Sequence, residues 1–174
     1  DELMRLMVEA GFNSIFVGIE TPNNESLIEC GKMQNLKRDL VESVNRIQRS
    51  GMLVSGGFII GFDNETEKVF DEQIDFIQRS GITSAMVGLL NAPTGTKLYN
   101  RLKEEGRLLE MWSGNNMDAN VNFVPKVEWK NLIRGYSRLL NTLYSQEEYY
   151  NRMKVFLKEY NVPVWTPKVI NLEQ

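Results

Sequence analysis

Three short joints constrain the fold of this 174-residue chain more than any other feature. Each joins the end of a helical pattern, a glycine and the start of an apolar run: Glu9-Ala10-Gly11-Phe12, Arg49-Ser50-Gly51-Met52 and Arg79-Ser80-Gly81-Ile82. Glycine ends a helix readily, because it adopts the left-handed conformation without steric cost. Repeated helix–strand alternation with such short returns predicts right-handed crossovers and a parallel sheet. We therefore expect an α/β fold.

The periodicity around the joints predicts the individual elements. Helices are expected over 1–10, 37–50 and 66–79, and a further helix carries Leu98, Leu102 and Leu108–Leu109. Apolar runs predict strands over 14–19, 52–60 and 82–90, of the kind that is buried on both faces. A short helix ending near Cys30 should follow the first strand. Thr21 is its expected cap, with Pro22 in the first turn, and Asn23 is the alternative cap.

The last third of the chain has a different composition. Residues 111–127 are polar and without a period, which predicts an irregular loop. Two amphipathic patterns follow, over 129–144 and 146–160, and predict a helical hairpin that packs on the α/β part. The tail, with Pro163 and Pro167, is expected to be extended. We expect two parts: an α/β part over 1–109 and a helical extension over 110–174.

Composition excludes several functions. The chain is 42% hydrophobic and 25% charged, with a net charge of -3, so nothing indicates binding to nucleic acid. No apolar run approaches the ~18 residues of a membrane span, and we expect a cytoplasmic protein. With no histidine and one cysteine, a zinc site or a histidine-based triad cannot form within this chain. Because Asp1 is not an initiator methionine, we expect a piece of a longer protein.

Candidate binding residues follow the predicted strands. Glu20 stands at the carboxyl end of the first strand, where its two oxygens suit a vicinal diol such as a ribose; a solvated acid or a helix cap is the alternative. Gly57 and Gly61 would let a flat ligand or a helix approach the backbone. The turn from Gly61 to Thr66 should help to form any site. Within it, Asp63, Asn64 and Glu65 also suit helix capping. Asn91, after the third strand, is a weaker candidate.

Three motifs in order resemble one family. They are Phe16-Val17-Gly18-Ile19-Glu20-Thr21, Gly57-Phe58-Ile59-Ile60-Gly61-Phe62-Asp63-Asn64-Glu65-Thr66 and Pro93-Thr94-Gly95-Thr96-Lys97-Leu98-Tyr99. At these spacings, residues 1–109 resemble the second half of a radical S-adenosylmethionine enzyme, in the branch with an N-terminal cobalamin-binding domain. Residues 110–174 resemble the C-terminal extension of that branch. The resemblance implies half of a (β/α)6 TIM-like partial barrel: three βα units that form strands four to six.

The resemblance also implies roles for particular residues. Glu20 would bind the ribose of S-adenosylmethionine, and Gly57, Ile59 and Gly61 would contact the adenine. Glu65 would belong to the same adenine motif, although it stands one residue later than the family pattern. The complete enzyme would use a [4Fe–4S] cluster to cleave S-adenosylmethionine to a 5′-deoxyadenosyl radical, with cobalamin-dependent methyl transfer as a further step.

The family's Cys-x-x-x-Cys-x-x-Cys motif is absent, and Cys30 alone cannot hold a cluster. No catalytic residue and no metal ligand is therefore assigned, and this piece should be inactive alone. Its expected partners are the missing N-terminal half of the same protein and a small-molecule substrate. The strand over 13–19 would become a bare edge and favour self-association. Two alternatives remain open: a non-catalytic α/β binding or interaction module, and half of an ordinary (β/α)8 enzyme.

Overall fold

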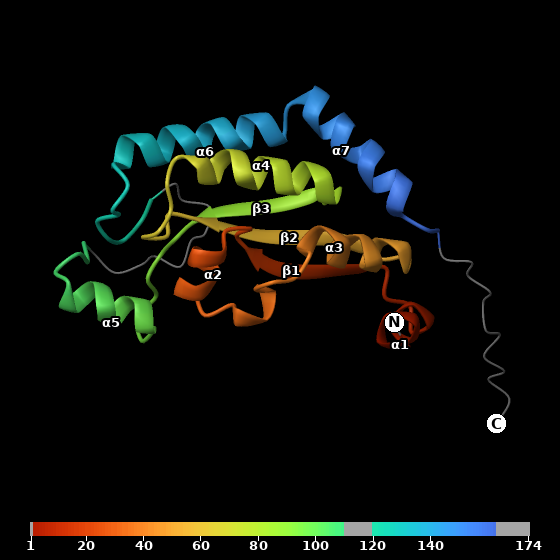
Figure 1. The fold of residues 1–174 in the computed structure, drawn as a ribbon, viewed down its shortest axis with the longest axis horizontal. Coiled ribbons are helices and arrows are strands. Elements are labelled where there is room, and N and C mark those ends of the chain that lie inside the picture. The colour runs from red at the N-terminus through yellow and green to blue at the C-terminus, as the bar shows by residue number, and fades with distance from the viewer. Residues whose placement is uncertain (1, 110–119, 163–174) are drawn as a thin grey trace, which may run out of the picture.

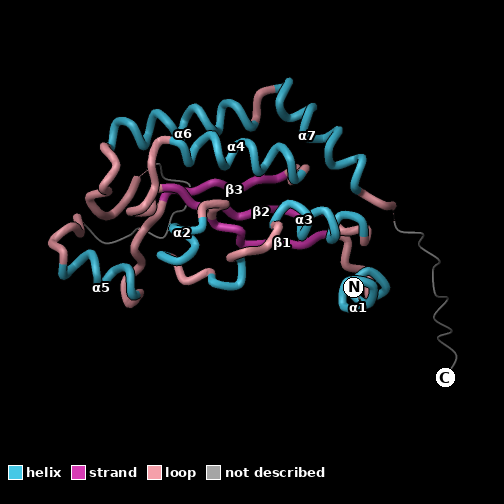
Figure 2. Tube along the Cα trace, viewed as in Figure 1, coloured by secondary structure: helices cyan, strands magenta, loops and turns pink. Residues whose placement is uncertain are grey.

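The structure, a computed structural model, describes residues 2–109 and 120–162, and its helices and strands alternate along the first hundred residues (Figure 2). The elements are α1 (Glu2–Glu9), β1 (Ser14–Glu20), α2 (Asn24–Glu29), the 3-10 helix η1 (Met33–Asn35), α3 (Leu40–Arg49), β2 (Leu53–Ile60), α4 (Lys68–Ser80), β3 (Ser84–Leu89), α5 (Lys97–Glu104), α6 (Trp129–Leu143) and α7 (Gln146–Glu159). This order confirms the predicted α/β fold with helices at its C-terminal end.

The three strands form one parallel sheet in the order β1-β2-β3. Parallel pairing follows from the three glycine joints, which return the chain from a helix to the next strand. Gly11, Gly51 and Gly81 all have a positive φ, of 92°, 97° and 66°. At Gly81 a second constraint applies, because a β-carbon there would lie 2.8 Å from the backbone nitrogen of Phe156 in α7. The joints therefore set both the strand direction and the close approach of α7.

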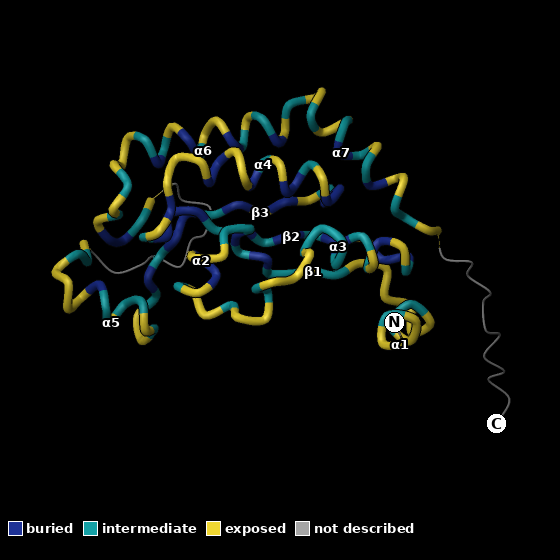
Figure 3. Tube along the Cα trace, viewed as in Figure 1, coloured by how far each residue is buried: buried dark blue, intermediate teal, exposed yellow. Residues whose placement is uncertain are grey.

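Buried residues are frequent along β2 and β3 (Figure 3), and the alternating burial of the strand residues shows that the two faces of the sheet differ. The face covered by α3, α4 and α6 holds the main hydrophobic core, and its strand residues are Ile19, Val54, Phe58, Ile60, Ala85, Val87 and Leu89. The opposite face carries Phe16, Gly18, Leu53, Gly57, Met86 and Gly88. Phe16 and Met86 are 59% and 57% exposed. The expectation of strands buried on both faces is wrong, because no layer of the described chain covers this second face.

The helix that follows β3 does not cover it. α5 lies beyond the carboxyl end of the strands (Figure 1), where Leu102 packs into a second, smaller hydrophobic cluster with Phe62, Leu90 and Phe123. α6 covers β3 instead, and Tyr136 and Tyr144 reach the strand from it. Because α6 shares the main core with the sheet, the boundary between 1–109 and 110–174 stays a prediction.

α7 continues the helical layer along α4. The two C-terminal helices are present as predicted, but they lie end to end along α4 rather than side by side as a hairpin (Figure 1). Arg152 of α7 is fully buried and donates hydrogen bonds to Leu143 O and to Gln78 Oε1 of α4, each at 2.8 Å. It lies against the rings of Tyr144 and Tyr149. A buried guanidinium thus joins the last three helices of this layer.

Several predicted boundaries need correction. α5 ends before Gly106, whose φ is 67°, so Leu108 and Leu109 are not helical; Leu108 forms an antiparallel bridge with Phe123. Asn23, the alternative cap, is the cap of α2: its side chain accepts the N–H of Ser26. α3 begins at Leu40 rather than at residue 37, because Asp39 supplies its cap. Residues 111–119 of the predicted loop and the Pro163–Pro167 tail lie outside the described residues.

Candidate functional site

The carboxyl ends of the three strands bring together residues that are far apart in sequence. β1 ends at Glu20, which stands opposite Phe58 of β2. β2 continues through the Gly61 turn, and the N–H of Leu90 donates to Ile60 O at 2.8 Å where β3 leaves the sheet. The end of the sheet is where α/β proteins place their ligands. The structure therefore brings the predicted Glu20 and Gly61 to one edge.

Glu20 has an unusual backbone. Its φ is 68°, a left-handed value that side chains rarely adopt, and the register of β1 shifts between Gly18 and Glu20. Its carboxylate Oε1 lies 2.8 Å from Lys32 Nζ, and the Glu20 side chain is 17% exposed. It is therefore neither a freely solvated acid nor a helix cap, the two alternatives that the sequence left open.

On the uncovered face, three glycines of neighbouring strands lie near Glu20: Gly18, Gly57 and Gly88. Gly18 is paired with Gly57, which is in turn paired with Met86, and no atom lies within 4 Å of a β-carbon built on Gly88. A β-carbon on Gly57 would lie 2.8 Å from Cζ of Phe16. The group that approaches Gly57 is thus an aromatic ring of the neighbouring strand. A flat ligand at Gly57 would have to meet or move Phe16.

The Gly61 turn is held from within by Glu65. Gly61 has a φ of 108°, and Glu65 Oε2 accepts the N–H of Gly61 at 2.6 Å and that of Phe62 at 3.2 Å. Burial raises the pKa of Glu65 to about 7, although the two N–H donors act in the opposite direction. The other oxygen, Oε1, is buried without a hydrogen-bond partner among the described residues. Glu65 therefore braces the turn from the inside.

Asp63 links the same turn to α5 and to the segment after it. Arg107 donates to both carboxylate oxygens at 2.7 Å, and Arg101 donates to Oδ2 at 3.0 Å. The hydrogen bonds from Arg107 lower the pKa of Asp63, whose side chain is 5% exposed. Arg101 also binds Glu29 of α2 at 2.8 Å. The network joins the turns after β1 and β2 to α5.

The predicted capping role of Asp63, Asn64 and Glu65 is wrong. α4 begins at Lys68, and its N-cap residue, Glu67, makes no side-chain cap bond. Asn64 instead donates to Glu29 Oε2 at 3.1 Å. Asp63 and Asn64 make tertiary contacts and Glu65 bonds within the turn, because the turn is two residues longer than the sequence pattern indicated.

Asn91 has a similar tertiary role. Its amide nitrogen donates to Leu89 O and to Asn120 O, each at 3.2 Å, and its oxygen accepts the N–H of Asn122. Asn122 is buried and exchanges two hydrogen bonds with the backbone of Ala92. Asn91 thus joins the end of β3 to the segment before α6, and its side-chain groups are used in that joint.

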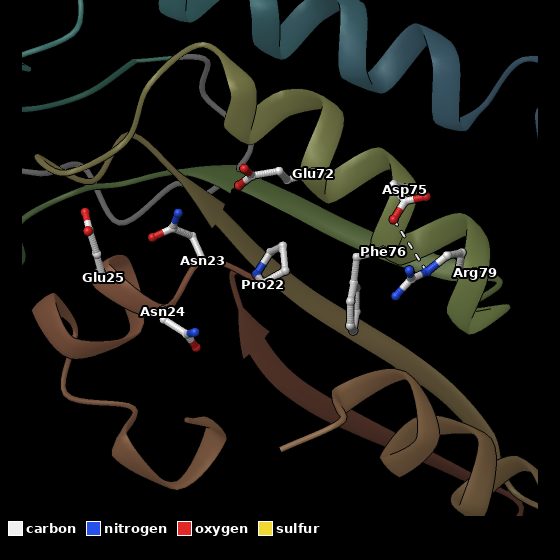
Figure 4. A pocket seen from close by; sticks show the side chains of 8 residues that line it. All are labelled: Pro22, Asn23, Asn24, Glu25, Glu72, Asp75, Phe76 and Arg79. Atoms are coloured by element: carbon white, nitrogen blue, oxygen red, sulfur yellow. Dashed lines mark ion pairs between the residues drawn. The ribbon is translucent and has the colours of Figure 1, made fainter. Parts of the chain in front are cut away.

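A surface hollow of about 480 Å³ lies on the helix side of the sheet, between the β1–α2 turn and α4 (Figure 4). Its lining residues are Pro22, Asn23, Asn24, Glu25, Glu72, Asp75, Phe76 and Arg79. Three of these are carboxylates, and Arg79 is paired with Asp75 at 3.4 Å. The hollow is open and lies on the other side of the sheet from Gly18, Gly57 and Gly88. We therefore place the candidate site at the carboxyl edge and on the uncovered face.

Within residues 2–109 and 120–162, no three cysteine, aspartate or glutamate side chains lie close enough together to hold a metal ion. Cys30 is exposed, but partial burial still raises the pKa of its thiol, which disfavours the thiolate form. None of the helices in the described part of the chain is long and apolar enough to cross a membrane.

The structure adds residues that the sequence pattern did not reveal. Lys32, Arg101 and Arg107 stand outside the three motifs and reach the site over sequence separations of 12 to 44 residues. No periodicity marks such residues, because their contacts depend on how the loops fold back over the sheet. The motifs located Glu20 and Gly61 only because strand ends can be read from apolar runs.

The chain is similar to proteins named as methyltransferases. It is 38% identical over 159 residues to an uncharacterized methyltransferase of Synechocystis sp., covering 90% of this chain and 30% of that protein. It is 37% identical over 123 residues to the hopanoid C-2 methylase of Rhodopseudomonas palustris, covering 71% and 23%. It is 24% identical over 153 residues to the bacteriochlorophyllide d C-12(1)-methyltransferase of Chlorobaculum tepidum, covering 88% and 33%.

These similarities concern a part of each relative. The chain spans about a third or less of the length of the curated relatives it matches. Residues 96–172 also match a family described as a domain of unknown function, DUF4070. That match includes α5, α6 and α7, while the similarity to the methyltransferases also reaches the sheet. The chain therefore has an α/β fold and is similar to a part of each of these proteins.

Proposed function

We propose that this chain is the carboxyl-terminal half of a radical S-adenosylmethionine barrel and contributes one side of the S-adenosylmethionine site in a methyltransferase. The proposal rests first on the difference between the two edges of the sheet. At the β3 edge, the Tyr144 hydroxyl bonds both the N–H and the carbonyl of Ala85, and the Tyr136 hydroxyl donates to Val87 O. This edge is closed by α6.

The β1 edge is left open. No strand of the described residues pairs with it, and the preceding helix, α1, buries none of its side chains. Leu3 and Leu6 of α1 are 71% and 47% exposed. Bare strand edges and apolar helix faces are normally covered in native proteins. One closed edge, one open edge and an uncovered inner face are what the last three strands of a six-stranded partial barrel would show.

The residues at the site have the chemistry that this role needs. We assign the ribose hydroxyls to Glu20, because a carboxylate at a strand end can accept two hydrogen bonds from a diol. The adenine is assigned to the wall formed by Ile59 and Gly61, with Gly57 below it. Glu65 would act on this wall through the turn that it braces rather than by contact. When bound in the complete protein, S-adenosylmethionine supplies the radical and methyl-transfer chemistry, and these residues orient it.

The residues do not fit an iron–sulfur cluster. A [4Fe–4S] cluster of this type needs three thiolates, and the chain has one cysteine and no histidine. We propose that the cluster ligands come from an N-terminal half of the same protein, and that this half is the partner that covers the uncovered face. Cobalamin, if used, would also be held by a part of the protein outside this chain. We also propose that the complete protein acts on a small-molecule substrate.

Titration of the 174-residue chain with S-adenosylmethionine tests the proposal. We expect weak binding, because half of the site is missing. Glu20→Gln should weaken it about tenfold, the effect of losing a charge-assisted hydrogen bond. Glu25→Gln, the same change at an exposed residue of α2, is the matched control and should have no effect.

Equal affinity of wild type and Glu20→Gln would contradict the assignment of Glu20. The coding sequence upstream of this chain provides a second check, since it should encode Cys-x-x-x-Cys-x-x-Cys. Its absence from the full gene would instead favour an α/β module without radical chemistry.

A further inference from the structure

Glu20 is held in a conformation that its own sequence does not favour. Besides its φ of 68°, the N–H of Thr21 donates to Ile19 O at 3.0 Å, which makes Glu20 the central residue of a γ-turn. A γ-turn with a left-handed central residue is rare and strained. Among the non-glycine residues that the structure describes, only Glu20 and Lys37 have a positive φ. Strain of this kind persists where the surroundings hold it in place, often at a binding site.

The carboxylate of Glu20 is turned back over the uncovered face. A β-carbon built on Gly18 would lie 2.9 Å from Glu20 Oε1 and 3.2 Å from Lys32 Nζ. The carboxylate and the ammonium therefore occupy the space that a side chain at residue 18 would need. Gly18 has no left-handed requirement of its own, so its lack of a side chain is explained by this close approach.

Lys32 makes the two contacts that fix this arrangement. Its ammonium lies 2.8 Å from Glu20 Oε1 and donates to Gly18 O at 3.4 Å. It reaches the strand end from the segment between α2 and η1, and its side chain is 32% exposed. The two groups that Lys32 contacts, the Glu20 carboxylate and the Gly18 carbonyl, both belong to the end of β1 and lie on either side of the shift in register.

We propose that Lys32 is a positioning residue for the ligand site: it orients the Glu20 carboxylate over Gly18, with Oε1 bound to the ammonium and Oε2 left for the ligand hydroxyls. That Glu20 binds the ligand hydroxyls rests on the proposed function. That Lys32 orients the Glu20 carboxylate does not. A simpler role for Lys32 would be to tether its own segment to β1. Asn35 provides that tether independently, because its amide donates to Ile19 O at 3.3 Å without touching the carboxylate.

The first test measures orientation without any ligand. In the 174-residue chain, NMR should show a nuclear Overhauser effect between the Glu20 γ-protons and the Gly18 α-protons. We expect this signal to be lost in Lys32→Gln, and to be kept in Lys32→Arg, which restores a cation, and in Asn35→Ala. A signal that survives unchanged in Lys32→Gln would overturn the proposal, as would its equal loss in Asn35→Ala.

The second test measures S-adenosylmethionine affinity. Lys32→Gln should weaken binding about tenfold, as Glu20→Gln does, and the double variant should be no weaker than Glu20→Gln alone. Lys32→Arg should recover most of the loss, and Lys130→Gln, the same change at an exposed position of α6, should be neutral. Additive losses would mean that Lys32 acts independently of Glu20 and would overturn its positioning role. If the wild type does not bind at all, the proposed function fails, while the NMR comparison still decides whether Lys32 orients Glu20.

Discussion

The two faces of the sheet are built from the same strands but differ in how far their side chains are buried. On the covered face, Phe58 is 2% exposed and meets Phe76 edge-on, with ring centroids 5.9 Å apart. On the other face, Phe16 is 59% exposed and lies over Gly57. The covered face therefore holds the core that stabilises the fold, while the uncovered face keeps apolar and small residues available for a ligand or for another part of the protein. Composition alone does not distinguish the two.

The two turns at the carboxyl edge differ in a similar way. The Gly61 turn is braced by the buried Glu65 and by the Asp63–Arg107 pair. The Glu20 turn is strained and depends on an ion pair with a partly exposed lysine. The first turn is held by buried side chains, and the second places a carboxylate on the uncovered face. The following predictions test these differences, from the largest expected effect to the smallest.

The largest contrast should come from Phe58→Ala and Phe16→Ala. Phe58→Ala removes a fully buried ring and should lower the free energy of unfolding by about 3–5 kcal/mol. Phe16→Ala makes the same chemical change on the same sheet and should cost about 1 kcal/mol or less, because its ring is mostly exposed. Urea unfolding of the two variants and the wild type measures both effects. Similar losses would mean that the second face is covered in solution.

The self-association of the chain is a second measure of the difference between the covered and the uncovered face. We propose that copies of this 174-residue chain meet through the open β1 edge and the uncovered face. Sedimentation velocity should then show a species larger than a monomer at high concentration, and Phe16→Ser should reduce it. A strictly monomeric wild type at high concentration would contradict this.

Glu65 should make stability depend on pH. Its pKa is about 4.5 in the unfolded chain and about 7 when folded, so between these values the folded state keeps a proton that the unfolded state has lost. The free energy of unfolding should therefore fall as the pH rises through this window, by up to about 3 kcal/mol, and then level off. Glu65→Gln should remove this part of the pH dependence. Urea midpoints for both proteins at pH 5 and pH 8 measure it, and parallel behaviour would show that Glu65 titrates normally.

The Asp63 network should contribute less. Asp63→Asn keeps the shape but removes the charge between Arg107 and Arg101, and we expect a loss of about 1–2 kcal/mol in the free energy of unfolding. Asp71→Asn is the matched control, since the Asp71–Arg138 pair has a similar distance of 2.8 Å but both side chains are at least half exposed. Such exposed pairs contribute about 0.5 kcal/mol or less. Equal losses in thermal unfolding would mean that Asp63 is no more than a surface ion pair.

The candidate site could be predicted in part. Glu20 and Gly61 were located because apolar runs mark strands, and the ends of parallel strands share one edge. Glu65 was predicted as a helix cap, which is wrong, because its side chain braces the turn, while its place in the adenine motif stays a prediction. Lys32 and Arg107 escaped prediction altogether, because their contacts depend on loops whose path is fixed by tertiary packing rather than by a local pattern.

The sequence by itself determined the direction of the chain: glycine joints after Glu9-Ala10, Arg49-Ser50 and Arg79-Ser80 can hardly give anything but parallel strands with intervening helices. It also excluded a cluster site, since one thiol cannot provide three ligands. Only the tertiary structure decided which face of the sheet is covered, and that α6 rather than α5 closes β3. The reason is physical. Helix and strand periods are local and appear in any short window, whereas covering a face or orienting Glu20 requires groups from distant segments to meet, and that is set by packing alone.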